Sequence, residues 1–180
     1  MRLLVKGGRV IDPANNIDEI ADVLVIDGKI AAIGKELSPD GNEDIVDAEG
    51  KIVCPGFIDI HVHLRDPGYE YKEDIITGSK AAAVGGFTTV CCMPNTDPVV
   101  DEGIVAEYIL RKSKEAGLVN VLPAGSITQN LEGEGLSEMA ELAQAGCVGF
   151  SDDGKPVTKS DVMRHAMDYA RMLNLPILSH

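Results

Sequence analysis

After Pro55-Gly56 the pattern of apolar and polar residues changes, and this change restricts the possible folds of the chain more than any other feature. From there on, short apolar segments typical of buried strands alternate with longer segments of helical periodicity. The expected strands cover residues 57–64, 87–93, 119–123, 147–150 and 177–179. The expected helices cover residues 71–84, 102–116, 136–145 and 161–173. Strands and helices that alternate in this way form parallel sheets with right-handed crossovers, so the expected fold class is α/β.

The residues before this change predict a separate, small β unit. Residues 23–26 and 29–33 flank Asp27-Gly28, a pair that favours the tight turn of a two-residue hairpin. Residues 45–48 and 51–53 flank Glu49-Gly50 and predict a second hairpin, while residues 3–10 predict one further strand and residues 39–42 a surface loop. We therefore expect two domains, a β unit over residues 1–54 and an α/β unit over residues 55–180.

Capping signals mark the expected helix ends. Asp101 and Ser160 stand where the N-caps of the second and fourth helices are expected. Glycines follow three helices at the positions typical of C-caps, at Gly85-Gly86, Gly117 and Gly146. Met163 and Met167 lie on the apolar face of the last helix, and we interpret them as core residues.

Charge and cysteine usage exclude several classes of function. The formal net charge of −13 argues against a nucleic-acid partner and against binding to an anionic membrane. No apolar run approaches the roughly 18 residues of a membrane span, and the first residues lack the apolar region of a signal peptide. The 4 cysteines show no C-x-x-C spacing, which favours reduced, mostly buried thiols in a cytoplasmic protein.

Two histidines end the first expected strand of the α/β unit. His61 and His63 are two residues apart, so on a strand their side chains point to the same face. Two converging neutral imidazoles can hold Zn²⁺ with Zn–N distances of about 2.0–2.1 Å. A His-x-His pair alone is a weak motif, and its interpretation depends on the other polar residues of the chain.

Those polar residues fall at the carboxyl ends of the expected strands. Asn95 follows the second strand, Asp152 and Asp153 follow the fourth, and His180 ends the fifth. In a (β/α)₈ barrel this rim forms the active site. The common position of these residues, more than any single motif, predicts a catalytic metal site at the rim.

Most of these residues also have a simpler interpretation. Asp153 could belong only to a turn, and Asp152 is the rival metal ligand or a residue that hydrogen-bonds a loop. His180 could be an exposed residue without a function. Arg65 could be a surface charge or a clamp for a substrate carboxylate, and Asn95 could shape a turn or contact substrate.

Two segments resemble a known family. Residues 55–68, which contain the histidine pair, resemble the opening barrel strand of the cyclic amidohydrolases. Residues 78–90 and the Met-Pro-Asn-Thr run at 93–96 resemble the dihydroorotases, of the class that includes the dihydroorotase portion of multifunctional pyrimidine-synthesis proteins. The resemblance implies a metal-dependent (β/α)₈ barrel of the amidohydrolase type, of which about five strands are present, preceded by part of a β-sandwich.

The resemblance also implies roles for individual residues. His61, His63, Asp153 and His180 would ligate one or two zinc ions, and Arg65 and Asn95 would hold the carboxylate of the substrate. Many relatives have a carboxylated lysine at the end of the fourth barrel strand. Here that place reads Ser-Asp-Asp, which resembles the subgroup with an aspartate ligand, and we assign that role to Asp153.

The reaction implied by the resemblance is the reversible cyclisation of N-carbamoyl-L-aspartate to L-dihydroorotate in de novo pyrimidine (UMP) biosynthesis. The family places its general acid–base aspartate on the eighth strand, so we expect no catalytic acid or base in this chain but one beyond His180. Because a (β/α)₈ domain takes about 250 residues, we expect these 180 to be one piece of a longer polypeptide, the rest being a separate chain or an associated fragment.

Two other functions remain open from the sequence. One is a non-catalytic scaffold subunit for aspartate transcarbamoylase, with which dihydroorotases of this type can associate. The other is an amidohydrolase of the hydantoinase or allantoinase type, because these enzymes share the histidine strand.

Overall fold

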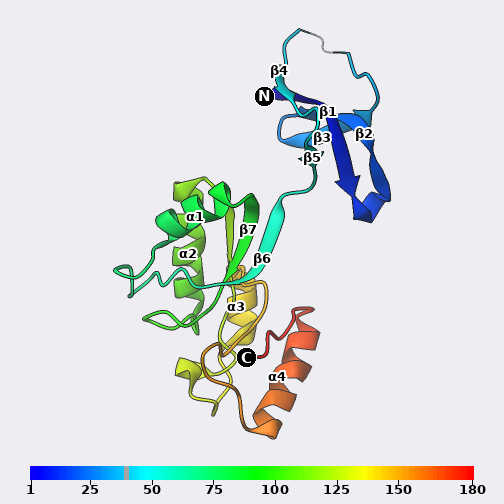
Figure 1. Cartoon of the computed structure of the whole chain (residues 1–180). Helices are drawn as coiled ribbons and strands as arrows, with labels where there is room; N and C mark the ends of the chain where they lie inside the picture. The colour runs from blue at the N-terminus through cyan, green and yellow to red at the C-terminus, as the bar shows by residue number, and fades with distance from the viewer. Residues whose placement is uncertain (39–40) are drawn as a thin grey trace. The chain divides into compact units, whose positions relative to one another are not determined.

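The computed structural model describes residues 1–38 and 41–180, which form two compact units, Met1–Pro55 and Gly56–His180 (Figure 1). Of the loop expected at 39–42, residues 39 and 40 lie outside the described residues. The strands of the first unit are β1 (Arg2–Asp12), β2 (Ile17–Ile26), β3 (Lys29–Gly34), β4 (Asp44–Asp47) and β5 (Ile52–Val53), with a 3₁₀ turn η1 at Pro13–Asn15. The second unit contains β6 (Phe57–Val62), α1 (Ile75–Val84), β7 (Phe87–Cys92), α2 (Gly103–Ala116), β8 (Asn120–Pro123), η2 (Gln129–Leu131), α3 (Met139–Ala145) and α4 (Ser160–Met172).

The first unit is one mixed sheet in the order β3-β2-β1-β4, with β5 also pairing with β1. The hairpin expected at Asp27-Gly28 is confirmed, because β2 and β3 are antiparallel and both turn residues have positive φ. Val10, Ala21 and Val23 form the buried apolar centre of this sheet.

The second expected hairpin is wrong. Strands β4 and β5 both run parallel to β1 and pair with successive parts of it, so the turn at Glu49-Gly50 interrupts a strand without reversing it. Between these two pairings, the register of β1 against β2 shifts between Val5 and Gly8. A Cβ atom at Gly8 would lie 2.5 Å from the side chain of Val53, so only glycine admits this close approach.

The second unit contains the parallel sheet that the alternation of strand and helix patterns in its sequence predicts. Strands β6, β7 and β8 are hydrogen-bonded in chain order, and single parallel bridges continue the sheet from Gly125 to Phe150 and from Phe150 to Ile177. The last two expected strands, 147–150 and 177–179, are therefore present as bridges and not as full strands. Their order along the sheet is as expected.

The two faces of this sheet have different contents. Helices α1 and α2 lie side by side on one face (Figure 1), where Cys92 and Val121 join Ile109 in the main core. Cys91 and Met93 pack with Ala124 in a second apolar cluster. The expectation of buried thiols is confirmed for three of the four cysteines; burial raises the pKa of Cys91 to about 11 and also raises that of Cys92, which keeps both protonated.

The helix ends differ in detail from those expected. The first helix begins at Ile75 and not at residue 71, and the N-cap of α2 is Glu102 and not Asp101. Ser160 is the first residue of α4, whose N-cap is Lys159. The expected glycine C-caps are confirmed, since Gly85, Gly117 and Gly146 occupy the C-cap positions of the first three helices. Of the two methionines expected in the core, Met163 packs against it, whereas Met167 is 51% exposed.

Substitution of the N-cap of α1 tests the local stability of this helix. Asp74 accepts a hydrogen bond of 2.7 Å from the Thr77 amide in a reciprocal capping box, and this bond is the main cause of its lowered pKa. We expect Asp74→Ala to lower the free energy of unfolding by about 1 kcal/mol in urea titrations of the intact natural polypeptide. Glu102→Ala is the matched control, because the Glu102 side chain makes no capping bond to α2.

The lowered pKa of Asp74 gives this prediction a pH dependence. A carboxyl group whose pKa is lower in the folded state stabilises the fold above its unfolded pKa of about 3.9, and that contribution disappears as the pH falls through the folded value. The difference between Asp74→Ala and the unsubstituted protein should therefore be full at pH 7 and smaller at pH 3. An equal difference at both pH values would contradict the capping interpretation.

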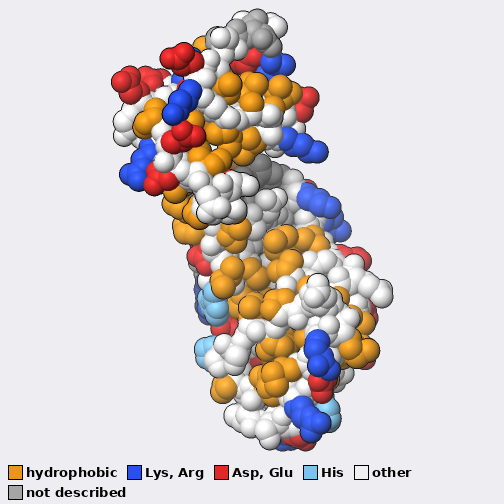
Figure 2. All heavy atoms as spheres, turned by 90° about the vertical axis from the view of Figure 1, so that its right-hand side faces the viewer, with side chains coloured by type: hydrophobic (Ala, Val, Ile, Leu, Met, Phe, Trp, Pro, Cys, Tyr) orange, Lys and Arg blue, Asp and Glu red, His pale blue; other side chains and the backbone are white. Residues whose placement is uncertain are grey.

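One strand of the second unit exposes large apolar side chains. On β6, Phe57 is 54% exposed, Ile58 64% and Ile60 66%, and β6 lies at the edge of the described sheet. Figure 2 shows hydrophobic side chains spread over the face of this unit that it presents. Apolar surface of this kind marks a contact surface.

None of the described helices is both long enough and apolar enough to cross a lipid bilayer.

Candidate metal centre

Three segments that are distant in the sequence deliver the expected ligands to one place. His61 lies on β6, and His63 follows its last residue. Asp153 comes three residues after the bridge residue Phe150, and His180 comes three residues after the bridge residue Ile177. The rings of the two β6 histidines converge, with their centroids 5.3 Å apart. The parallel order of the strands thus places these side chains at the same end of the sheet.

The carboxylate of Asp153 lies at the centre of the cluster. Its Oδ1 is 3.0 Å from Nε2 of His61 and 3.2 Å from Nδ1 of His180, and its Oδ2 is 3.4 Å from Nε2 of His63. His61, His63 and Asp153 each offer one ligand atom, and these three atoms lie within 4.8 Å of one another. Asp153 is only 5% exposed, and among the described residues it pairs with no lysine or arginine.

The hydrogen bonds of Asn95 fix the tautomer of His63. The amide nitrogen of Asn95 donates to Oδ2 of Asp153 at 3.1 Å, because a carboxylate only accepts. The amide oxygen therefore faces Nδ1 of His63, at 3.0 Å, and that nitrogen must donate. In the neutral ring the lone pair then lies on Nε2, the atom directed at Asp153. This is the arrangement in which a second residue orients a metal-bound imidazole.

The donor set fits a divalent cation such as zinc. In the neutral tautomer, Nε2 of His63 and Oδ2 of Asp153 both present lone pairs across 3.4 Å, which is unfavourable unless a cation or an added proton lies between them. Two imidazole nitrogens and a carboxylate oxygen are the ligand types that Zn²⁺ takes in catalytic sites. A buried carboxylate surrounded by histidines also needs positive charge to offset its desolvation.

The structure separates Asp152 from Asp153, the two rivals for the ligand role. Asp152 is 2% exposed, and its Oδ1 accepts the amides of Ile127 and Thr128 at 2.8 and 3.0 Å. The Thr128 hydroxyl donates to its other oxygen. Asp152 is thus the residue that hydrogen-bonds a loop, and the carboxylate of Asp153 is the one that faces the histidines.

A substitution of Asp152 tests this separation. In Asp152→Asn, the amide oxygen can still accept the Ile127 and Thr128 amides, but an NH2 group replaces the oxygen that accepts the Thr128 hydroxyl proton. We therefore expect the free energy of unfolding to fall by about 1–3 kcal/mol. The zinc content of the folded variant should equal that of the unsubstituted protein. Elemental analysis and urea titration of the same sample measure both quantities. Loss of zinc without loss of stability would reverse the assignments of the two aspartates.

The two residues expected to bind substrate have different surroundings. Asn95 bridges His63 and Asp153, a role that its position after β7 did not reveal. Arg65 lies two residues after His63 and is partly exposed, and its guanidinium makes no hydrogen bond or ion pair with any described residue. The sequence signal for the role of Asn95 is weak, because only the fold brings it between two residues 90 positions apart.

The geometry and the solved structures define the class of fold. The L-hydantoinase (dihydropyrimidinase) from Arthrobacter aurescens superposes with a TM-score of 0.81 at 29% identity, over 99% of this chain and 40% of that one. A D-hydantoinase superposes with a TM-score of 0.70 at 23% identity, over 100% of this chain and 40% of that one. The chain therefore has an α/β fold of the amidohydrolase type.

Sequence comparison then gives the family. The model of the family described as dihydro-orotase-like matches residues 50–180, and the chain belongs to this family. A dihydroorotase from Geobacter sulfurreducens is 58% identical over all 180 residues, and one from Syntrophotalea carbinolica is 54% identical over the same length. The chain spans 42% of the length of each of these relatives.

Proposed function

We propose that the polypeptide containing this chain is a zinc-dependent dihydroorotase, which interconverts N-carbamoyl-L-aspartate and L-dihydroorotate in de novo pyrimidine biosynthesis. The observation that carries the proposal is the convergence of His61, His63 and Asp153, from segments 90 residues apart, in a chain 58% identical to a dihydroorotase. His180 is a fourth proposed ligand, because its Nδ1 lies beside the Asp153 carboxylate.

The chain's own residues would hold the cation and orient its ligands. His61 and His63 would present ring nitrogens, Asp153 the counter-charge, and Asn95 would keep the His63 tautomer fixed. A bound zinc ion would lower the pKa of a water molecule and polarise the ring carbonyl. Elemental analysis of the folded protein would show whether it binds one zinc ion or two.

Arg65 would bind the carboxylate of the substrate. Its guanidinium has no partner among the described residues and stands two positions from a proposed ligand, so it is free to form a bidentate pair. We also propose Asn95 as a contact to the substrate, in addition to its bridge between His63 and Asp153. A fixed carboxylate would hold the ring amide in a defined position and thereby supply part of the rate enhancement.

We further propose that Gly56–His180 is the first half of a (β/α)₈ barrel and that Met1–Pro55 is part of a β-sandwich. The exposed apolar side chains of β6 support this, because the remaining strands and helices of the barrel would cover them. The general acid–base would then come from the part of the protein that corresponds to the other 58% of the relatives' length, since the chain spans 42%.

Two alternatives are separated by one assay. The TM-score of 0.81 with an L-hydantoinase favours a hydantoin ring as the alternative substrate, and a scaffold subunit would open no ring. The intact natural polypeptide is incubated with dihydroorotate, hydantoin and allantoin, and ring opening is followed by loss of ultraviolet absorbance. Hydrolysis of dihydroorotate well above the others supports the proposal. Preference for hydantoin or allantoin, or no turnover of any ring, contradicts it.

Location and partners complete the proposal. We propose a cytoplasmic protein, which the absence of disulfides among the described cysteines supports, and aspartate transcarbamoylase as a candidate partner. Co-purification of the intact polypeptide with that enzyme, followed by size-exclusion chromatography, tests the partnership.

A further inference from the structure

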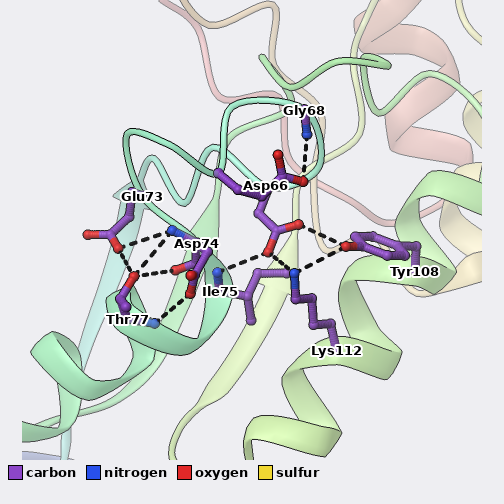
Figure 3. Close-up of polar contacts among 9 residues, drawn as sticks. Asp66, Gly68, Glu73, Asp74, Ile75, Thr77, Tyr108 and Lys112 are labelled. Carbon is purple, nitrogen blue, oxygen red and sulfur yellow. Dashed lines mark hydrogen bonds and ion pairs between the residues drawn. The ribbon is translucent and has the colours of Figure 1, made fainter.

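A buried carboxylate outside the metal centre has its own set of partners. Asp66 lies three residues after His63 and is 1% exposed. Its Oδ2 is 2.6 Å from Nζ of Lys112, and its Oδ1 accepts a hydrogen bond of 3.0 Å from the Tyr108 hydroxyl. Lys112 also donates to that hydroxyl at 3.2 Å (Figure 3). The three side chains form a closed polar cluster, which we call the Asp66 cluster.

The Asp66 cluster joins the loop after β6 to two helices. Tyr108 and Lys112 are one turn apart on α2, and Figure 3 shows both directed at Asp66 from that helix. The same carboxylate accepts the amide of Ile75, the first residue of α1, at 3.2 Å. Burial opposes the charge of Lys112, but its hydrogen bonds to Asp66 and Tyr108 raise its pKa, so Lys112 stays charged throughout the neutral range.

Arg65, the residue before Asp66, has a backbone conformation that needs support. Its φ is +59°, in the left-handed region that a residue with a long side chain rarely adopts. Both neighbours are anchored. Leu64 is 6% exposed and belongs to the main core. It packs so closely on Gly78 that a Cβ atom added there would lie 2.4 Å from Cδ2 of Leu64. Asp66 is held by the Asp66 cluster. The two anchors thus fix the strained turn between them.

We propose that the Asp66 cluster is a positioning device that holds Arg65 in the conformation that binds the substrate carboxylate, so that Asp66, Tyr108 and Lys112 determine affinity for substrate without touching it. This inference rests on the proposed function of the site. The polar atoms of the cluster are bound to one another and to the Ile75 amide, so the proposed role of the cluster is to hold Arg65 and not to bind substrate.

The test is a double-mutant cycle on the intact natural polypeptide loaded with zinc. Tyr108→Phe and Asp66→Asn each weaken the cluster, and each is combined with Arg65→Ala. In the Arg65 background we expect KM for dihydroorotate to rise about threefold for Tyr108→Phe and about tenfold for Asp66→Asn, with kcat changed less than about twofold. In the Arg65→Ala background neither change should alter KM further, because the residue that transmits the effect is absent.

Controls separate positioning from a loss of stability. Tyr169→Phe removes a tyrosine hydroxyl on α4 that has no hydrogen-bond partner among the described residues, and it should leave KM unchanged. Tm and zinc content are measured for every variant. Tyr108→Phe keeps the ion pair between Asp66 and Lys112, so it still tests the inference if Asp66→Asn does not fold. An unchanged KM, or an equal rise in both backgrounds, overturns the inference. If the unsubstituted protein opens no dihydroorotate ring, the proposed function itself fails, and the inference falls with it.

Discussion

Asp153→Ala should reduce the affinity of the protein for zinc by at least about a hundredfold. The carboxylate of Asp153 contacts three histidine rings at 3.0–3.4 Å and carries the negative charge that offsets a bound cation. Loss of a residue that only orients a ligand costs about 10–100-fold in metal affinity, so loss of a direct ligand should reach the top of that range or exceed it. Competition with a chromogenic chelator measures the affinity, and kcat/KM for dihydroorotate should fall at least as far.

Asp161→Ala is the matched control for this substitution. Asp161 is exposed in the first turn of α4, so removal of its carboxylate should leave zinc affinity unchanged. The folded state of Asp153→Ala is checked by circular dichroism, because a variant that has lost its fold says nothing about ligands. If the folded variant binds zinc as tightly as the unsubstituted protein, Asp153 is not a ligand.

Lys112→Met should destabilise the protein by about 3–5 kcal/mol. The carboxylate side chain of Asp66 is completely buried, and Lys112 is the cation that it pairs with at 2.6 Å. Removal of one partner from a buried ion pair leaves the other charge without compensation, which is the main source of the cost. Urea titration of the intact natural polypeptide gives the free energy of unfolding.

Two further variants show that the charge, and not the volume, causes the loss. Asp66→Asn combined with Lys112→Met leaves no buried charge and should recover most of the lost free energy. Lys114→Met removes an exposed lysine from the same helix and should change stability by less than about 0.5 kcal/mol. If Lys112→Met and Lys114→Met have equal effects, the ion pair with Asp66 does not stabilise the loop.

The alternation of strands and helices after residue 55 could be predicted because each element carries its own local pattern. Strands β6, β7 and β8 have short apolar runs, and the glycines that follow the first three helices occupy their C-caps. The convergence of His61, His63 and Asp153 could also be predicted, because parallel strands bring their carboxyl ends to one edge. Both predictions depend on local patterns and a general rule of topology.

The features that the sequence did not predict depend on contacts between residues distant in the sequence. The hairpin at Glu49-Gly50 failed because β1 accepts both β4 and β5 on one side, and nothing local reveals that pairing. Asp152 and Asp153 are adjacent acidic residues, and only distant contacts distinguish them: the loop amides of Ile127 and Thr128 bind Asp152, whereas the histidines face Asp153. The Asp66 cluster was missed for the same reason, since 42 residues separate Asp66 from Tyr108.

Anomalous diffraction at the zinc absorption edge, from crystals of the intact natural polypeptide, locates the bound metal directly. We expect a zinc peak about 2.0–2.2 Å from a ring nitrogen of His61, a ring nitrogen of His63 and a carboxylate oxygen of Asp153. A zinc-loaded, active protein whose anomalous peak lies away from these three side chains would contradict it.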